Sequence, residues 1–139
     1  MIKFSEDRLS VAEYLSLREA VGWKKLSERQ AELVLENCLY CISAYDDDKL
    51  IGMGRIVGDG AVICYIQDLI VLPEYHGKGV GSMLMKQLKK YVSGLLAEGE
   101  EIMFDLMCAK GREMFYEKHG FIARPTDALG PGMIQYIRK

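Results

Sequence analysis

One stretch of the sequence restricts the fold more than any other. An apolar segment ending at Val71 runs into a loop with glycines at 77, 79 and 81, and an amphipathic helix follows directly. The first turn of a helix has backbone N–H groups without partners inside the helix, and it carries the positive end of the helix dipole. Glycines let a bulky anion approach those N–H groups, and Lys78 adds a mobile positive charge. The stretch therefore predicts a strand, a loop and a helix that bind a pyrophosphate group.

The spacing of the glycines separates this loop from two other phosphate-binding loops. No Gly-Lys-Ser/Thr ends it, so it is not a Walker A loop. The spacing Gly77-x-Gly79-x-Gly81 in the middle of the chain also differs from the Gly-x-Gly-x-x-Gly of dinucleotide-binding folds. The remaining alternative is a glycine-rich turn before an ordinary helix.

Strand and helix patterns alternate along the chain without repeats or linkers, so we expect a single domain over 1–139. Capping boxes at Ser10 and Ser27 each predict the start of a helix. A stripe of apolar residues at helical spacing predicts a third helix, with one face formed by Val80, Leu84, Leu88, Tyr91 and Leu95. Strands are expected at 2–4, 40–45, 50–57, 61–71, 101–108, 121–123 and 133–138, with a short helix at 111–119. This order predicts an α/β protein with a mixed sheet, in which 61–71 and 101–108 are parallel.

Composition excludes some classes of function. The 139 residues are 50% hydrophobic and 27% charged, with a net charge of −2, which is ordinary for a globular protein and gives no electrostatic footprint for nucleic acid. No apolar run is long enough to span a membrane, and the N-terminus lacks a secretory apolar region. We therefore expect a cytoplasmic protein that binds neither nucleic acid nor membranes.

The four cysteines include a C-x-x-C pair, Cys38 and Cys41. A zinc ribbon would need a second pair, and a thioredoxin-type motif lies where a strand leads into a helix, whereas this pair lies where a helix leads into a strand. Reduced, buried thiols are the favoured interpretation, with a redox or metal role as the alternative. We expect no metal site.

The loop resembles the acetyl-CoA loop of the GNAT superfamily of N-acetyltransferases. The pattern there is [Gln/Arg]-x-x-Gly-x-[Gly/Ala] after a strand that ends Val-x-Pro-x-Tyr, and His76 stands where the family usually has Gln or Arg. The resemblance implies a central mixed sheet flanked by helices, with a splayed pair of parallel strands, and a homodimer. It implies acetyl-CoA as co-substrate, with pantetheine along the last residues of the strand and pyrophosphate on the loop. The implied contacts are Leu69, Ile70, Val71, His76, Gly77, Lys78, Gly79, Val80, Gly81 and Ser82.

A second motif, Phe115-Tyr-Glu-Lys-His-Gly-Phe121, resembles the Phe-Tyr-x-Lys-x-Gly-Phe signature of the same superfamily. The resemblance implies that the hydroxyl of Tyr116 lies near the thioester sulfur and donates a proton to the leaving thiolate. The alternative is an ordinary core tyrosine. His119 lies three residues further on the same helix face, where it is more often a solvated residue at the helix end.

The amine that attacks the thioester must first lose a proton. Asp68 is the nearest acidic candidate for this base, a water chain is equally compatible, and a structural salt bridge is the other role for Asp68. Strict alternation along the strand would let only one of Gln67 and Asp68 face the acceptor.

The acceptor is not identified by the sequence. In the superfamily the segment between the first two helices lines the acceptor pocket, and here it contains Gly22-Trp23-Lys24. A polyamine, an amino acid, an aromatic amine and a protein amine all remain open, and a small-molecule primary amine is favoured. A non-catalytic acyl-CoA-binding module is the second function class.

Overall fold

The structure, a computed structural model, describes residues 1–139 and has two compact units, Met1–Leu106 and Met107–Lys139. The first unit contains a five-stranded sheet in the order β1-β2-β3-β4-β5. Its strands are β1 (Ile2–Ser5), β2 (Tyr40–Asp46), β3 (Lys49–Gly58), β4 (Ile63–Val71) and β5 (Met103–Asp105). Successive strands from β1 to β4 are antiparallel, and β4 and β5 are parallel. The predicted mixed sheet with one parallel pair is confirmed.

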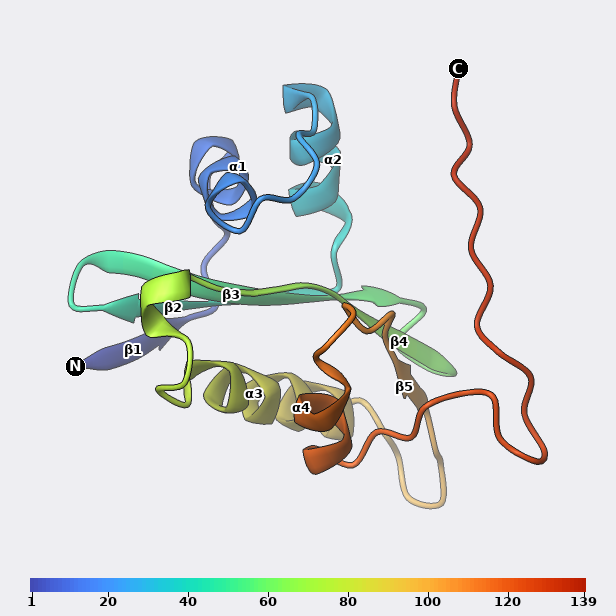
Figure 1. The fold of residues 1–139 in the computed structure, drawn as a ribbon. Helices are drawn as coiled ribbons and strands as arrows, with labels where there is room; N and C mark the ends of the chain where they lie inside the picture. Colours follow the sequence, from blue (N-terminus) through green and yellow to red (C-terminus); the bar gives the residue numbers. More distant parts are fainter. The chain divides into compact units, whose positions relative to one another are not determined.

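Helices cover both faces of this sheet. α1 (Val11–Ala20) and α2 (Glu28–Asn37) lie on one face, and α3 (Val80–Gly94) lies on the other (Figure 1). Both predicted capping boxes are present: the hydroxyl of Ser10 accepts from the N–H of Glu13 at 3.1 Å, and that of Ser27 accepts from Gln30 at 3.0 Å. These local hydrogen bonds satisfy first-turn amides and so fix where each helix begins.

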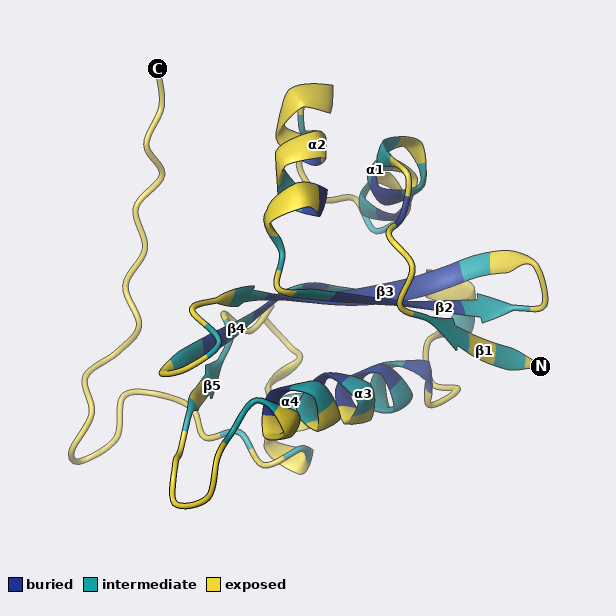
Figure 2. Ribbon diagram, turned by 180° about the vertical axis from the view of Figure 1, so that it is seen from behind, coloured by how far each residue is buried: buried dark blue, intermediate teal, exposed yellow.

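The core lies between the sheet and the helices, where dark blue buried faces meet in Figure 2. α3 buries Val80, Leu84 and Leu88, as the apolar stripe predicts, and it also buries Met85 and Val92, which lie outside that stripe. Tyr91, which the stripe also includes, is half-buried at its margin and stacks on Tyr40 with ring centres 4.2 Å apart. None of the helices combines the length and the apolar character that crossing a membrane would require.

The second unit contains one helix, α4 (Glu113–Lys118), within the segment where a short helix was expected. The strands predicted at 121–123 and 133–138 are wrong, because the structure forms no strand after β5. Their alternating apolar pattern is only a preference for a half-buried surface, and a strand forms when a partner supplies the ladder and the cover. Met133 and Ile137 are 87% and 88% exposed.

Candidate functional site

The glycine-rich loop joins the end of β4 to α3 through one 3-10 turn, η1 (Pro73–Tyr75). Gly77 and Gly79 have φ angles of 77° and 83°, a backbone region that glycine adopts far more readily than other residues. Gly79 is the N-cap of α3, and the first turn of α3 contains no acidic residue. A Cβ on either glycine would meet no heavy atom within 4 Å. The N-terminus of α3 is therefore accessible to an anion and is not opposed by a neighbouring carboxylate.

His76 and Tyr75 fix the start of the loop through hydrogen bonds, and the charged end of Lys78 stays exposed. The Nε2 atom of His76 is 2.7 Å from the carbonyl oxygen of Val71, so the imidazole ties the loop back to the end of β4. The hydroxyl of Tyr75 donates to Asp46 at 2.8 Å. The Nζ atom of Lys78 lies 5.1 Å from the centre of the Tyr75 ring, and the Lys78 side chain is exposed. An exposed ammonium beside the helix N-terminus is suited to a mobile phosphate contact.

The loop residues from His76 to Gly79 are exposed on the surface. Two hollows of the first unit lie elsewhere: one of about 330 Å³ borders Tyr91 at the C-terminal end of α3, and one of about 410 Å³ borders Cys38 and Cys41. No residue of the loop lines either hollow. The loop would therefore bind an extended ligand along the surface.

The sheet opens beside the second half of β4. Pairing with β5 covers only Ile63 to Tyr65, so the rest of that edge of β4 has no strand against it. The N–H of Leu72 donates to Ile51 on β3 at 2.8 Å. Because backbone groups of successive residues in a strand point to opposite edges, those of Leu69 and Val71 point to the open edge. An extended ligand could add there like a further strand.

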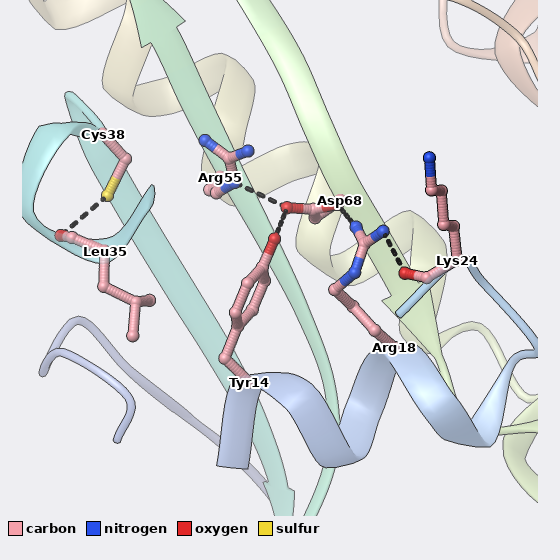
Figure 3. Close-up of polar contacts among 7 residues, drawn as sticks. All are labelled: Tyr14, Arg18, Lys24, Leu35, Cys38, Arg55 and Asp68. Atoms are coloured by element: carbon pink, nitrogen blue, oxygen red, sulfur yellow. Dashed lines mark hydrogen bonds and ion pairs between the residues drawn. The ribbon is translucent and has the colours of Figure 1, made fainter. Parts of the chain in front are cut away.

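A cluster of four polar side chains, three buried and one half-buried, lies on the sheet face covered by α1 and α2 (Figure 3). The carboxylate of Asp68 accepts hydrogen bonds from the hydroxyl of Tyr14 at 2.5 Å, from Nε of Arg55 at 2.6 Å and from Nη1 of Arg18 at 2.9 Å. The Asp68 side chain is 0% exposed, and those of Arg55 and Arg18 are 10% and 12% exposed. The cluster joins α1, β3 and β4 in one network.

Arg18 extends this network to the segment between α1 and α2. Its Nη2 donates to the carbonyl oxygen of Lys24 at 2.9 Å, and its guanidinium lies 5.4 Å from the centre of the Trp23 ring. Trp23 is 37% exposed. The segment that was expected to border the acceptor is thus fixed to β4 through one arginine and one carboxylate.

Burial and the contacts with Asp68 determine the protonation of Tyr14 and Arg55. Burial, and then the hydrogen bond to Asp68, raise the pKa of Tyr14 to about 12, so its phenol is protonated at neutral pH and acts as the donor. Burial lowers the pKa of Arg55, but the charge and hydrogen bond of Asp68 outweigh it and raise the pKa overall. The guanidinium of Arg55 therefore stays charged beside Asp68.

Asp68 meets one of the two predicted roles more readily than the other. Both carboxylate oxygens are already held by donors from three side chains, which is the geometry of a structural ion pair. The strict alternation that would let only one of Gln67 and Asp68 face the acceptor does not hold in β4. A register shift lies between Met53 and Arg55 on β3, and the register opposite Arg55 puts Gln67 on the face where Arg55 binds Asp68.

Tyr116 lies on α4 in the second unit, among aromatic rings of that unit. Its ring makes edge contacts with Phe115 and Phe121, with centres 5.1 and 5.9 Å apart. Burial, and then the nearby Cys108 thiol, raise the pKa of Tyr116, whereas the charge of Arg112 lowers it. The phenol is thus protonated at neutral pH, as a proton donor must be. His119 follows as the C-cap of α4 and contacts Phe115.

The C-x-x-C pair lies at the end of α2 and the start of β2. Cys38 is the C-cap of α2 and is half-buried, and Cys41 is buried in β2. Burial, and then the neighbouring Cys38, raise the pKa of the Cys41 thiol to about 12. A thiol with this pKa forms little thiolate at neutral pH and is a poor redox nucleophile.

Three members of the Asp68 cluster were missed by the sequence reasoning. Arg55 is a charged residue inside the apolar segment 50–57, and such a residue needs a buried partner. Tyr14 and Arg18 are four residues apart on α1, which puts them on one helix face. The charged residue in an apolar segment was therefore visible in the sequence. Its partners were not, because Arg18 and Asp68 lie 50 residues apart.

Comparison with known proteins places this geometry in a family. The GNAT acetyltransferase domain family matches residues 37–123. The uncharacterized ycf52-like N-acetyltransferase of Prochlorococcus marinus is 30% identical over 127 residues, which cover 88% of this chain and 68% of the relative. A protein of unknown function from meticillin-resistant Staphylococcus aureus has a structure with a TM-score of 0.86 at 34% identity, and a GNAT-family acetyltransferase from Streptococcus pneumoniae has one of 0.81 at 31% identity; both comparisons cover 100% of both chains.

The fold, with its parallel strand pair and the glycine-rich loop at the start of α3, defines an acyltransferase of the GNAT type. The chain belongs to the GNAT superfamily of acetyltransferases. The resemblance carried by the two sequence motifs is therefore confirmed.

Proposed function

We propose that this protein transfers the acetyl group of acetyl-CoA to a primary amine of a small molecule, by direct attack in a ternary complex. The observation that carries the proposal is the open edge of β4 followed directly by the glycine loop of α3. One surface thus offers unpaired strand backbone to an amide-containing chain and a helix N-terminus to a pyrophosphate. In CoA the amide-containing pantetheine chain is likewise followed by the pyrophosphate, so its parts have the same order as the two binding surfaces.

Two groups of residues would bind two parts of the co-substrate. The backbone of Leu69 and Val71, with Ile70 between them, would pair with the amides of pantetheine. The pyrophosphate would bind the loop from His76 through Gly77, Lys78, Gly79, Val80 and Gly81 to Ser82. The imidazole of His76 already bonds the carbonyl of Val71, so His76 contributes its backbone and holds the loop in place.

The reaction needs three events at the thioester. A neutral amine nitrogen forms a bond to the carbonyl carbon, and the negative charge on the carbonyl oxygen is stabilised by the N–H of Leu69 at the open edge. The carbon–sulfur bond then breaks, and CoA leaves as a thiolate. Tyr116 would donate the proton that the thiolate takes up, and the amine loses a proton to a base or to water. A free tyrosine titrates near ~10 and a thiol near ~8.5, so this transfer contributes modestly unless the site changes one of the two.

Either Asp68 or a water chain would take the proton of the amine. The three hydrogen bonds that the Asp68 carboxylate already accepts favour the water chain. We keep the cytoplasmic location and the homodimer as predictions.

A CoA-release assay tests the proposal. The protein is incubated with acetyl-CoA and a library of polyamines, amino acids, aromatic amines and short peptides, and free thiol is measured. Release that depends on one small-molecule class supports the proposal. Saturable acetyl-CoA binding without release for any amine would identify the protein as a non-catalytic acyl-CoA-binding module. Turnover of peptides alone would contradict the small-molecule acceptor.

A further inference from the structure

β4 contains a bulge at Asp68 and Leu69. Met53 is opposite Ile70 and Arg55 is opposite Gln67, so two residues of β4 face the single residue Gly54 on β3. Asp68 has a φ of 57°, the left-handed region that residues other than Gly, Asn and Asp seldom adopt. This left-handed residue marks the bulge.

The bulge reverses the direction of the backbone groups that follow it. Before the bulge, the carbonyl of Val62 accepts from the N–H of Met103, which begins β5. The backbone N–H and C=O groups of even-numbered residues there therefore point toward the β5 edge. After the bulge, the N–H of Leu72 donates to a carbonyl of β3. The backbone N–H and C=O groups of even-numbered residues there therefore point away from the β5 edge. The N–H of Leu69 therefore reaches the open edge only because Asp68 adds one residue to the strand.

The side chain of Asp68 fixes this backbone from α1 and β3. Tyr14 and Arg18 on α1 and Arg55 on β3 all donate to its carboxylate. Rotating Asp68 out of the left-handed region would break these contacts in a buried site, so the three donors stabilise the bulge.

We propose that Asp68 is a positioning residue, which holds the β4 bulge in the left-handed conformation and thereby aims the N–H of Leu69 at the thioester oxygen. The inference rests on the proposed acetyl transfer. It assigns the role of Asp68 to its backbone conformation, with the carboxylate as an anchor. A base role would instead depend on the carboxylate alone.

Three variants separate these roles, because Gly and Asn adopt a positive φ more readily than Ala does. Asp68→Ala is expected to lower kcat by about 100-fold, the loss typical of a misaligned oxyanion donor. Asp68→Gly and Asp68→Asn should each retain at least about tenfold more activity than Asp68→Ala. Equal activity in all three variants would assign the effect to the lost carboxylate and overturn the proposal. Asp47 is the matched control, since it has a φ of 54° in an exposed turn, and Asp47→Ala should leave kcat unchanged.

A second variant covers the case in which removing the buried carboxylate prevents folding. Tyr14→Phe keeps all charges paired and removes one anchor, so kcat should fall about 3- to 10-fold with the KM for acetyl-CoA unchanged. Tyr91→Phe, which removes a hydroxyl bonded to Leu39 at 3.3 Å, is the control and should have no effect on kcat. If Asp68 is the base, losing a donor leaves the base in place, and unchanged or higher kcat in Tyr14→Phe would overturn the proposal.

Failure of the acetyl-transfer function is distinguishable from failure of this inference. If the unmodified protein releases no CoA with any amine, the function fails, and the variants are then compared by the ratio of acetyl-CoA to CoA affinity in calorimetry. Only acetyl-CoA carries the oxygen that the N–H of Leu69 would contact. A ratio that falls in Asp68→Ala and not in Asp68→Gly supports the positioning role, and a ratio equal in both contradicts it.

Discussion

Replacing Gly79 with alanine should weaken acetyl-CoA binding much more than it weakens the fold. Gly79 has a φ of 83°, and a Cβ built there meets no heavy atom within 4 Å. The protein without ligand therefore bears only the cost of a left-handed alanine, about 1 kcal/mol of unfolding free energy. For a chain of this size that corresponds to a decrease of about 3 to 4 °C in Tm.

The effect on binding has a different origin. The methyl group would stand at the N-cap of α3, where the proposed pyrophosphate would approach the first-turn amides. Losing one charge-assisted hydrogen bond costs about 1.5 to 3 kcal/mol, which raises the Kd for acetyl-CoA about 10- to 100-fold. Valine at the same position should have the larger effect, since a branched side chain resists this backbone region more strongly.

Gly99 supplies a matched control for this substitution. It has a φ of 80° and equally open surroundings, but it lies between α3 and β5, outside the loop. Gly99→Ala should lower Tm as much as Gly79→Ala does and leave the Kd unchanged. The measurements are thermal melts and titration calorimetry of the two variants. If folded Gly79→Ala binds acetyl-CoA as tightly as Gly99→Ala, the loop is not the pyrophosphate site.

Three further outcomes are expected. Acetyl-CoA at about 100 times its Kd should stabilise the fold by about 2.7 kcal/mol, and equal thermal shifts with NAD and ATP would contradict a CoA site. The pKa of Tyr14 is raised to about 12, so its contribution to stability is complete below pH ~10 and is lost as the pH rises toward 12. Urea unfolding should therefore show a steeper loss of stability between pH 10 and 11 for the unmodified protein than for Tyr14→Phe, and parallel curves would refute this sign. Tyr116→Phe should lower kcat and kcat/KM together, by about 100-fold at most, with acetyl-CoA affinity unchanged; unchanged kcat with a lower Tm would make Tyr116 a core residue.

Local features were predictable from the sequence because their causes lie within a few residues. The capping boxes at Ser10 and Ser27 depend on contacts three residues apart, and both helices begin where these predict. The apolar stripe of α3 depends only on helical periodicity, and its members Val80, Leu84 and Leu88 are buried. The motif in the loop indicated the GNAT superfamily, and the comparisons confirmed it.

Features that depend on distant partners were not predictable in this way. The bulge at Asp68 is set by register against β3 and by donors from α1, and a single strand sequence contains neither. The strands predicted at 121–123 and 133–138 do not form, although the segments have a strand-like pattern. Such a pattern does not supply the neighbouring strand that a strand must pair with. Tertiary contacts decided both cases.

The Asp68 cluster explains the presence of a charged residue in the middle of a buried strand. Two arginines and one carboxylate in a protein interior are seldom favourable for stability alone, because removing three charged groups from water costs more than their attraction returns unless the geometry is good. Here each oxygen of Asp68 has a close donor, and the same contacts fix both the bulge of β4 and the segment at Lys24. An apolar replacement could fill the space, but it could not hold a left-handed residue in the strand. The buried charge is therefore better explained by the backbone conformation it fixes at the open edge of β4 than by the stability it adds.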